Sequence, residues 1–319
     1  MKLFKRLFTG LLILLIIVSI AALIYILQWQ EKPVDVGPPE KDAKQERLPP
    51  AVSPKAERDR PPRATPPVGK TSPGREKDKA LLAKVEKMPL RRVAIIIDDI
   101  GNDLGPVREL LKIDTGITFA ILPLCSHTRD AADLIYRAHR EILLHLPMEP
   151  SSYPREKPGN GALFTDMNAG ELLSQLDKDL ASVPHISGVN NHMGSKFMSN
   201  EEKVTIIFSR LRKENLFFID SRTAADSKAA VASEKVGLPL ASRKIFLDNS
   251  RNYKEIYKIL IEVTENAGGD DAAPIIIIGH PYPETIRAIK DAASIFQAKG
   301  VVVVPVSQLI KDRIPRGSS

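Results

Sequence analysis

Several apolar runs of this sequence end in a side chain that could do chemistry. The run from Val93 to Ile97 is followed at once by two adjacent carboxylates, Asp98 and Asp99. Carboxylate oxygens and neutral imidazole nitrogens bind divalent metals, and the same groups act as general acids and bases. Imidazoles or single carboxylates end five later apolar runs, at His145, His192, Asp220, Asp248 and His280. If these side chains meet in space, they form a metal site with acid–base groups around it.

An alternation of strands and helices after Leu90 would position these residues. Amphipathic or capped stretches separate the apolar runs, and one helix is expected to begin at Ser199, with Glu202 completing a capping box. Another is expected over 252–265, stopping at Gly268 and Gly269. About eight such alternations predict an α/β fold with a parallel sheet, open or closed into a (β/α) barrel. The expected strands cover 93–99, 116–123, 140–147, 186–192, 216–220, 244–248, 274–280 and 301–306.

This arrangement would bring the chemical side chains to one place. In parallel α/β folds the carboxyl ends of the strands share a face, and that face carries the active site. Each residue also has a structural interpretation: a lone histidine is often only hydrogen-bonded, and the two aspartates could cap a helix or bind magnesium in a receiver-like domain. Seven such residues at one mouth favour the functional interpretation. The other histidines, His127, His139 and His185, are expected in loops or helices with structural or surface roles.

The first 88 residues are expected to form an anchor and a stalk. Residues 7–27 are almost wholly apolar, long enough to cross a bilayer of about 30 Å, and three basic residues precede them. Residues 1–30 are therefore interpreted as a cytoplasmic N-terminus and transmembrane helix, with a cleaved signal peptide as the alternative. Residues 31–88 are proline-rich and charged, as in an extended spacer, although their Pro-Pro steps could also dock an envelope protein. Residues 89–319 would form the folded domain in the periplasm, on a single-pass inner-membrane protein.

Charge and cysteine content exclude some classes of function. Residues 1–92 hold 19 Lys or Arg against 10 Asp or Glu, a formal charge of +9, whereas the rest of the chain is nearly neutral at −2. Nucleic acid is therefore not expected as a partner of the folded domain. The single cysteine, Cys125, cannot form an internal disulfide and does not identify the redox compartment.

The motifs resemble a known family. The phrases IDDIGND, LHLPMEP, GVNNHMGS, FFIDS, FLDN and IGHP are similar to the divergent branch of the NodB-type polysaccharide deacetylases. The resemblance covers about 91–315. It implies a NodB-like (β/α) barrel, often incomplete, that holds a divalent metal with one Asp and two His. It also implies hydrolytic removal of acetyl groups from a cell-envelope or exported glycan.

The resemblance also implies roles for individual residues. Asp98 corresponds to the catalytic base, Asp99 and His145 to metal ligands, and His280 to the general acid. The family's second histidine motif has two histidines four residues apart, and here Glu149 stands at the second place. Either Glu149 replaces that ligand, or His192 supplies it from the neighbouring strand end, which is the favoured interpretation. The family's Arg-x-Pro-Tyr motif is not recognisable in this chain.

The residue types suit amide or ester hydrolysis. A metal with imidazole and carboxylate ligands lowers the pKa of bound water from about 16 toward 7, and a neighbouring carboxylate can accept the proton. Backbone N–H groups of residues 190–195 would stabilise the oxyanion. Zinc fits this donor set best, and iron, cobalt or manganese fit nearly as well. A second hypothesis, motivated by the departures from the family motifs, is a glycan- or partner-binding envelope protein that keeps the barrel but has lost turnover.

Overall fold

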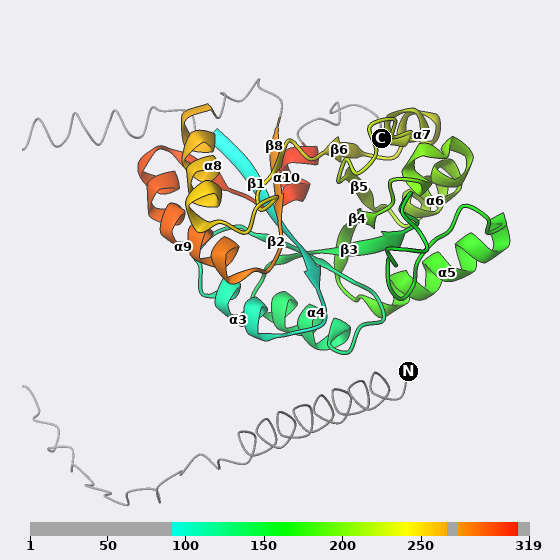
Figure 1. Cartoon of the computed structure of the whole chain (residues 1–319), viewed down its shortest axis with the longest axis horizontal. Coiled ribbons are helices and arrows are strands. Elements are labelled where there is room, and N and C mark those ends of the chain that lie inside the picture. The colour runs from blue at the N-terminus through cyan, green and yellow to red at the C-terminus, as the bar shows by residue number, and fades with distance from the viewer. Residues whose placement is uncertain (1–90, 267–273, 312–319) are drawn as a thin grey trace, which may run out of the picture. The chain divides into compact units, whose positions relative to one another are not determined.

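A computed structural model describes residues 91–266 and 274–311 (Figure 1). The predicted anchor and stalk, residues 1–88, lie outside the described residues, as do Gly268 and Gly269. Within the described ranges, no helix combines the length and apolar character that a bilayer span requires. The strands are β1 (Arg91–Ile100), β2 (Thr118–Ile121), β3 (Glu141–Met148), β4 (Ile186–Met193), β5 (Phe217–Asp220), β6 (Leu240–Ser242), β7 (Ile245–Phe246), β8 (Ile275–Gly279) and β9 (Val301–Val303).

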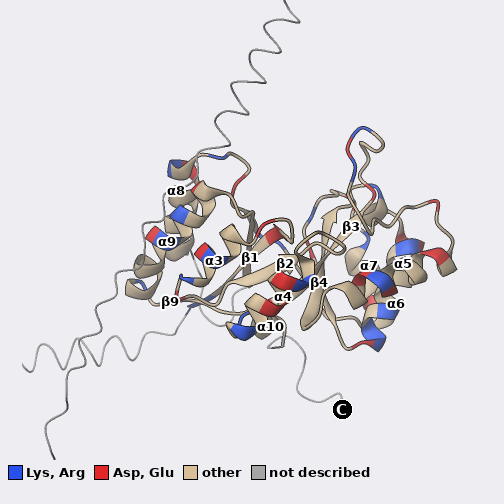
Figure 2. Cartoon of the chain, turned by 90° about the horizontal axis from the view of Figure 1, so that it is seen from below, with Lys and Arg blue, Asp and Glu red and all other residues tan. Residues whose placement is uncertain are grey.

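Helices connect the strands and surround the curled sheet (Figure 1). Charged residues lie mostly on these helices and on the loops, with both signs interspersed, whereas the strands are largely uncharged (Figure 2). The helices are α3 (Gly105–Leu111), α4 (Thr128–Arg137), α5 (Ala169–Ser182), the 3₁₀ helix η1 (Phe197–Ser199), α6 (Glu201–Lys213), α7 (Ala229–Val236), α8 (Tyr253–Asn266), α9 (Pro283–Ala298) and α10 (Val306–Lys311).

The sheet is parallel throughout and forms an incomplete barrel. Its strand order is β6-β5-β4-β3-β2-β1-β8-β7, with β9 also paired to β1. The two edge strands, β6 and β7, are joined by only Arg243 and Lys244, so the sheet must curl until its edges are close. The Arg243 N–H donates to the carbonyl of Asp220 at the end of β5, and the Lys244 N–H donates to that of Ile276 on β8. The predicted incomplete (β/α) barrel is therefore confirmed, and its seam lies where residues 240–246 change partner.

Alternation along the strands separates an inner core from an outer one. On β1, Val93, Ile95 and Ile97 pack under the helices, whereas Ala94 and Ile96 point into the barrel. Gly188 on β4 leaves room for the Phe217 ring, since a Cβ there would lie 2.4 Å from that ring. The interior is thus filled with apolar side chains, three of which come from α10. The other inner residues are Ala120, Leu143, Phe217, Ile219, Ala241, Ile276, Ile278, Val304, Val306, Leu309 and Ile310.

Helix boundaries show one error in the sequence analysis. The N-cap of helix α6 is one residue later than predicted, because the side chain of Asn200 accepts a hydrogen bond from the Lys203 N–H. The Ser199 hydroxyl instead donates to Asp226, so the predicted Ser199–Glu202 capping box is wrong. A reciprocal capping box is present at α5, between Asn168 and Glu171. Helix α8 begins at Tyr253, after Asn252 as expected.

Asp179 is a buried carboxylate that predicts a pH-dependent stability. It lies on α5 with no exposed surface, and its Oδ2 has no hydrogen-bond partner, while Gln175 donates to Oδ1. Burial raises its pKa to about 7. Between about pH 4 and pH 7 the folded chain keeps a proton that the unfolded chain releases, so the free energy of unfolding should fall as pH rises through this range.

Substituting Asp179→Asn should remove this loss of stability. At pH 8 the variant should unfold at a temperature several degrees above wild type, about 1–3 kcal/mol more stable, with little difference at pH 4.5. Thermal melts of the full-length protein across this range would measure it. Asp177→Asn, which changes an exposed carboxylate paired with Arg210, is the matched control. Equal melting temperatures for Asp179→Asn and wild type at pH 8 would contradict the prediction.

Candidate functional site

Inward-facing residues at the ends of β1, β3, β4 and β8 meet at the mouth of the barrel. The alternation that points Ala94 and Ile96 inward continues to Asp98, which is 3% exposed. The next residue would point outward in a regular strand. Asp99 instead has φ +57°, and the pairing of β1 with β2 shifts register between Ile97 and Ile100. Aspartate tolerates this left-handed conformation better than most residues, and it brings both adjacent carboxylates to one site.

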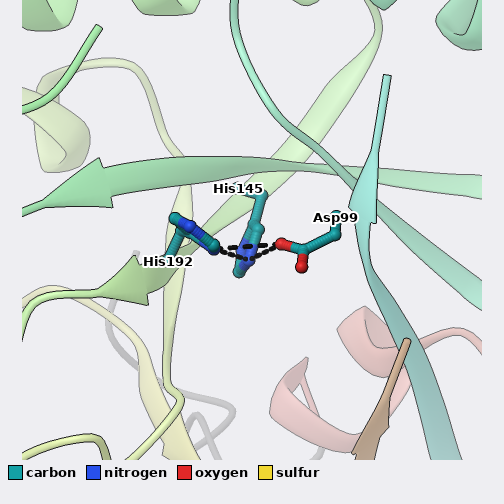
Figure 3. A group of neighbouring side chains, drawn as sticks. All are labelled: Asp99, His145 and His192. Carbon is teal, nitrogen blue, oxygen red and sulfur yellow. Dashed lines mark hydrogen bonds and ion pairs between the residues drawn. The ribbon is translucent and has the colours of Figure 1, made fainter. Parts of the chain in front are cut away.

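Asp99, His145 and His192 form a three-residue cluster (Figure 3). Asp99 Oδ1 lies 3.2 Å from His145 Nε2 and 3.0 Å from His192 Nδ1, and the two nitrogens are 3.1 Å apart. Two ligands about 2.0–2.1 Å from a zinc ion at a tetrahedral angle are separated by about 3.3 Å. The triangle of donor atoms therefore has nearly the dimensions of one face of a zinc coordination shell.

The oxygen of this triangle is otherwise unsatisfied. Asp99 Oδ1 is buried and accepts no well-directed hydrogen bond, although both imidazole nitrogens are near. Burial alone would raise the pKa of Asp99, but the two imidazoles hold it well below its ordinary value. A buried carboxylate oxygen without a directed donor, facing two nitrogens, is an arrangement that a cation would satisfy. The residues present therefore fit a divalent metal.

Asp98 and Asn190 flank the cluster on the interior side. Asp98 Oδ2 lies 3.6 Å from His145 Nε2, and Asp98 Oδ1 accepts a hydrogen bond of 2.8 Å from the Asn190 amide. Burial raises the pKa of Asp98, whereas His145 and Asn190 act against that rise. For His145, burial lowers the pKa, but the charges of Asp98 and Asp99 raise it to about 8. The environment of Asp98 thus favours a carboxyl group that can take up a proton.

His280 follows β8, which pairs with β1 on the side away from β3 and β4. Its Nδ1 lies 2.9 Å from Asp248 Oδ1, and its Nε2 lies 3.7 Å from Asp99 Oδ2. The other Asp248 oxygen accepts hydrogen bonds from the His280 backbone N–H and the Thr285 hydroxyl. Burial lowers the pKa of His280, but Asp248 and the other carboxylates raise it above its ordinary value. Asp248 therefore holds the ring and favours its protonated form.

Glu149 is outside the cluster. Its Oε2 accepts from the backbone N–H and the hydroxyl of Thr165, and its Oε1 pairs with Lys196 at 2.7 Å. These contacts occupy the carboxylate and tie together the loops that follow β3 and β4. His192 instead lies two residues after Asn190, on the same face of β4, with its backbone paired to Pro147. Of the two candidates left open for the third ligand, the structure brings His192 to the cluster.

A comparison with protein families identifies the chain. The family described as divergent polysaccharide deacetylase matches residues 95–310. The chain belongs to this family. The match contains both aspartates of β1, the three histidines and Asp248. The resemblance to this family that the short motifs indicate is thus confirmed over nearly the whole described domain.

Individual proteins are similar to this chain over about two thirds of its length. YibQ of Escherichia coli strain K12, described as uncharacterized, is 34% identical over 215 residues, 66% of this chain and 65% of YibQ. The match therefore spans less than two thirds of that relative. An uncharacterized protein of Haemophilus influenzae is 31% identical over 62% of this chain and 70% of its own length. A crystal structure of an uncharacterized protein from Agrobacterium tumefaciens C58, 22% identical, covers 70% of this chain and 91% of that chain with a TM-score of 0.66, and shows the same fold.

Two parts of the site differ from what the sequence predicted. Asp220 lies at its strand end as expected, but its neighbour Ile219 points into the barrel, and Asp220 accepts from the Arg222 N–H and the Ser227 hydroxyl. It shapes the loop after β5 and does not join the cluster. Asn190, by contrast, was not singled out in the sequence. The signal that could have found Asn190 is its inward position opposite His145. That position follows only from the register of β3 against β4.

Proposed function

We propose that this chain is a metal-dependent hydrolase that removes acetyl groups from a polysaccharide. The observation that carries the proposal is the triangle of Asp99 Oδ1, His145 Nε2 and His192 Nδ1, with Asp98 and His280 beside it. Membership of the divergent polysaccharide deacetylase family supports an acetylated glycan as the substrate class. We propose zinc as the metal, because two imidazoles and one carboxylate leave a position open for water or substrate.

The chain's own residues have distinct tasks in this proposal. Asp99, His145 and His192 would hold the metal, which supplies an activated water and polarises the acetyl carbonyl. Asp98 takes up the proton released by that water, since its carboxylate lies within 3.6 Å of a ligand nitrogen. His280, kept protonated and oriented by Asp248, donates a proton to the leaving amine or alcohol. Stabilisation of the oxyanion by backbone N–H groups of residues 190–195 stays a prediction.

Placement in the cell is part of the proposal. The apolar segment of residues 7–27 and the basic residues before it support a single-pass anchor with the N-terminus in the cytoplasm. The proline-rich residues 31–88 support a spacer that carries the domain outward into the periplasm. A substrate in the cell envelope or an exported glycan would then be within reach.

Release of acetate tests the proposed activity. Full-length protein, loaded with zinc, should release acetate from at least one member of a panel of N- and O-acetylated oligosaccharides. An enzyme-coupled acetate assay would measure it, with His280→Gln as the inactive reference. Release of acetate at equal rates by wild type and His280→Gln would contradict the proposed site. Binding of metal and glycan without acetate release would instead support the glycan-binding protein considered from the sequence.

A further inference from the structure

Asn190 connects a proposed metal ligand to the proposed catalytic base. It is completely buried on β4, and its backbone pairs in register with that of His145 on β3. Its side-chain Oδ1 lies 2.9 Å from His145 Nδ1, and its Nδ2 donates to Asp98 Oδ1 at 2.8 Å. Nδ2 also lies 3.4 Å from the Ser221 hydroxyl oxygen. Both ends of one amide are thus occupied by functional groups of the site.

The hydrogen bonds from Asp98 through Asn190 to His145 have a fixed order of donors and acceptors. The NH₂ group of Asn190 faces Asp98, because its Nδ2 donates to Asp98 Oδ1. The carbonyl oxygen of the amide then faces His145, and a carbonyl oxygen only accepts. Nδ1 of His145 must therefore carry a proton. The neutral ring consequently has its lone pair on Nε2, the nitrogen that faces Asp99 and His192.

We propose that Asn190 is a positioning residue that holds His145 in the Nδ1–H tautomer and so presents Nε2 to the metal. The inference rests on the proposed function in taking His145 as a metal ligand. The opposite tautomer would place a lone pair of Nδ1 against the Asn190 oxygen, between two side chains that are buried. Asp98, by accepting from the same amide, fixes which way the amide points. The orientation of the Asn190 amide thus determines which nitrogen of the His145 ring is available to the metal.

Replacing Asn190 with an apolar residue should remove these hydrogen bonds with little change in side-chain volume. In Asn190→Leu, His145 Nδ1 and Asp98 Oδ1 each lose a buried hydrogen-bond partner, and the tautomer of His145 is no longer imposed. Loss of the residue that orients a ligand histidine typically weakens metal binding by about 10–100-fold. We expect a loss of that size in zinc affinity, measured by competition with a chromophoric chelator on the full-length protein.

Nitrogen NMR of the histidine rings measures the tautomer directly. In metal-free wild type, at a pH above the pKa of His145, the Nδ1–H form of His145 should predominate, and Asn190→Leu should show a mixture. Asn190→Asp should separate the two contacts, because its carboxylate still accepts from His145 but repels Asp98. This variant should retain the tautomer and bind zinc at least as tightly as wild type, while releasing acetate at least about tenfold more slowly.

Asn191→Leu is the matched control. Asn191 is also a buried asparagine on β4, but its amide contacts the Ser221 N–H, the Met193 carbonyl and Thr223. The control should lose stability while keeping the tautomer of His145 and wild-type zinc affinity. An Nε2–H tautomer in wild type, or equal zinc affinity for Asn190→Leu and wild type, would overturn the inference. If acetate release is found for no glycan, the tautomer and affinity results still decide the inference separately from the proposed function.

Discussion

Replacing Asp99 with asparagine should reduce bound metal from about one equivalent per chain to a small fraction of that. Asparagine tolerates the left-handed backbone of residue 99 as aspartate does, so the fold should be retained. The charge that holds the cation is lost, and we expect affinity to fall by more than about 100-fold, beyond the effect of changing a residue that only orients a ligand. His192→Ala should lose metal to a similar extent. Elemental analysis of full-length protein purified without chelator measures both.

Glu149→Gln provides the control for this prediction. Glu149 is the alternative third ligand in the sequence, but its carboxylate is occupied by Thr165 and Lys196. The variant should therefore keep its metal and lose only some stability from the weakened loop contacts. Loss of metal in Glu149→Gln with retention in His192→Ala would reverse the assignment of the third ligand. Retention of metal in both Asp99→Asn and His192→Ala would remove the proposed site altogether.

Replacing His280 with glutamine should remove most turnover while leaving the metal in place. Glutamine can still accept or donate hydrogen bonds, but it cannot transfer a proton to the leaving group. Proton transfer by a positioned side chain contributes about 10²–10⁴-fold, so kcat for acetate release should fall by that factor. Bound zinc should stay near one equivalent, because His280 is not a member of the three-residue cluster. Steady-state kinetics together with metal analysis separate the two effects.

Two further variants, Asp248→Asn and His127→Gln, test how specific the effect of His280→Gln on kcat is. Asp248 contacts the reacting groups only through His280, so Asp248→Asn should lower kcat less than His280→Gln does. His127 is exposed and paired with Asp130, and its replacement should leave kcat unchanged. A His280→Gln variant with the kcat of wild type would exclude His280 as the general acid. The proton would then have to come from another group at the mouth.

Local sequence pattern was enough to predict most of the strands and the end of the barrel that carries the polar residues. Runs such as Val93–Ile97 and Ile275–Ile278 are apolar at every position because both faces of a parallel strand are covered. Parallel strands place their carboxyl ends together, so Asp98, His145 and His280 could be assigned to one mouth before any contact was known. The short motifs were enough to recognise the family.

The partner of each polar side chain depended on contacts that local pattern does not contain. The sequence predicts one strand over 244–248, yet residues 240–246 divide into β6 and β7 because they pair with two different strands. Ser199 and Asn200 are both good helix caps, and Ser199 is drawn instead to Asp226, which is distant in sequence. Where two adjacent residues are equally good caps, contacts with residues distant in sequence decide which of them caps the helix.

The same limit applies within the site. The choice between Glu149 and His192 depended on where Thr165 and Lys196 lie, since these residues occupy the carboxylate of Glu149. The role of Asn190 depended on the register of β3 against β4. Residue types and strand ends therefore specified which chemistry the chain could perform. Register, the φ angle of Asp99 and long-range hydrogen bonds decided which side chains meet, because those depend on packing between segments tens of residues apart.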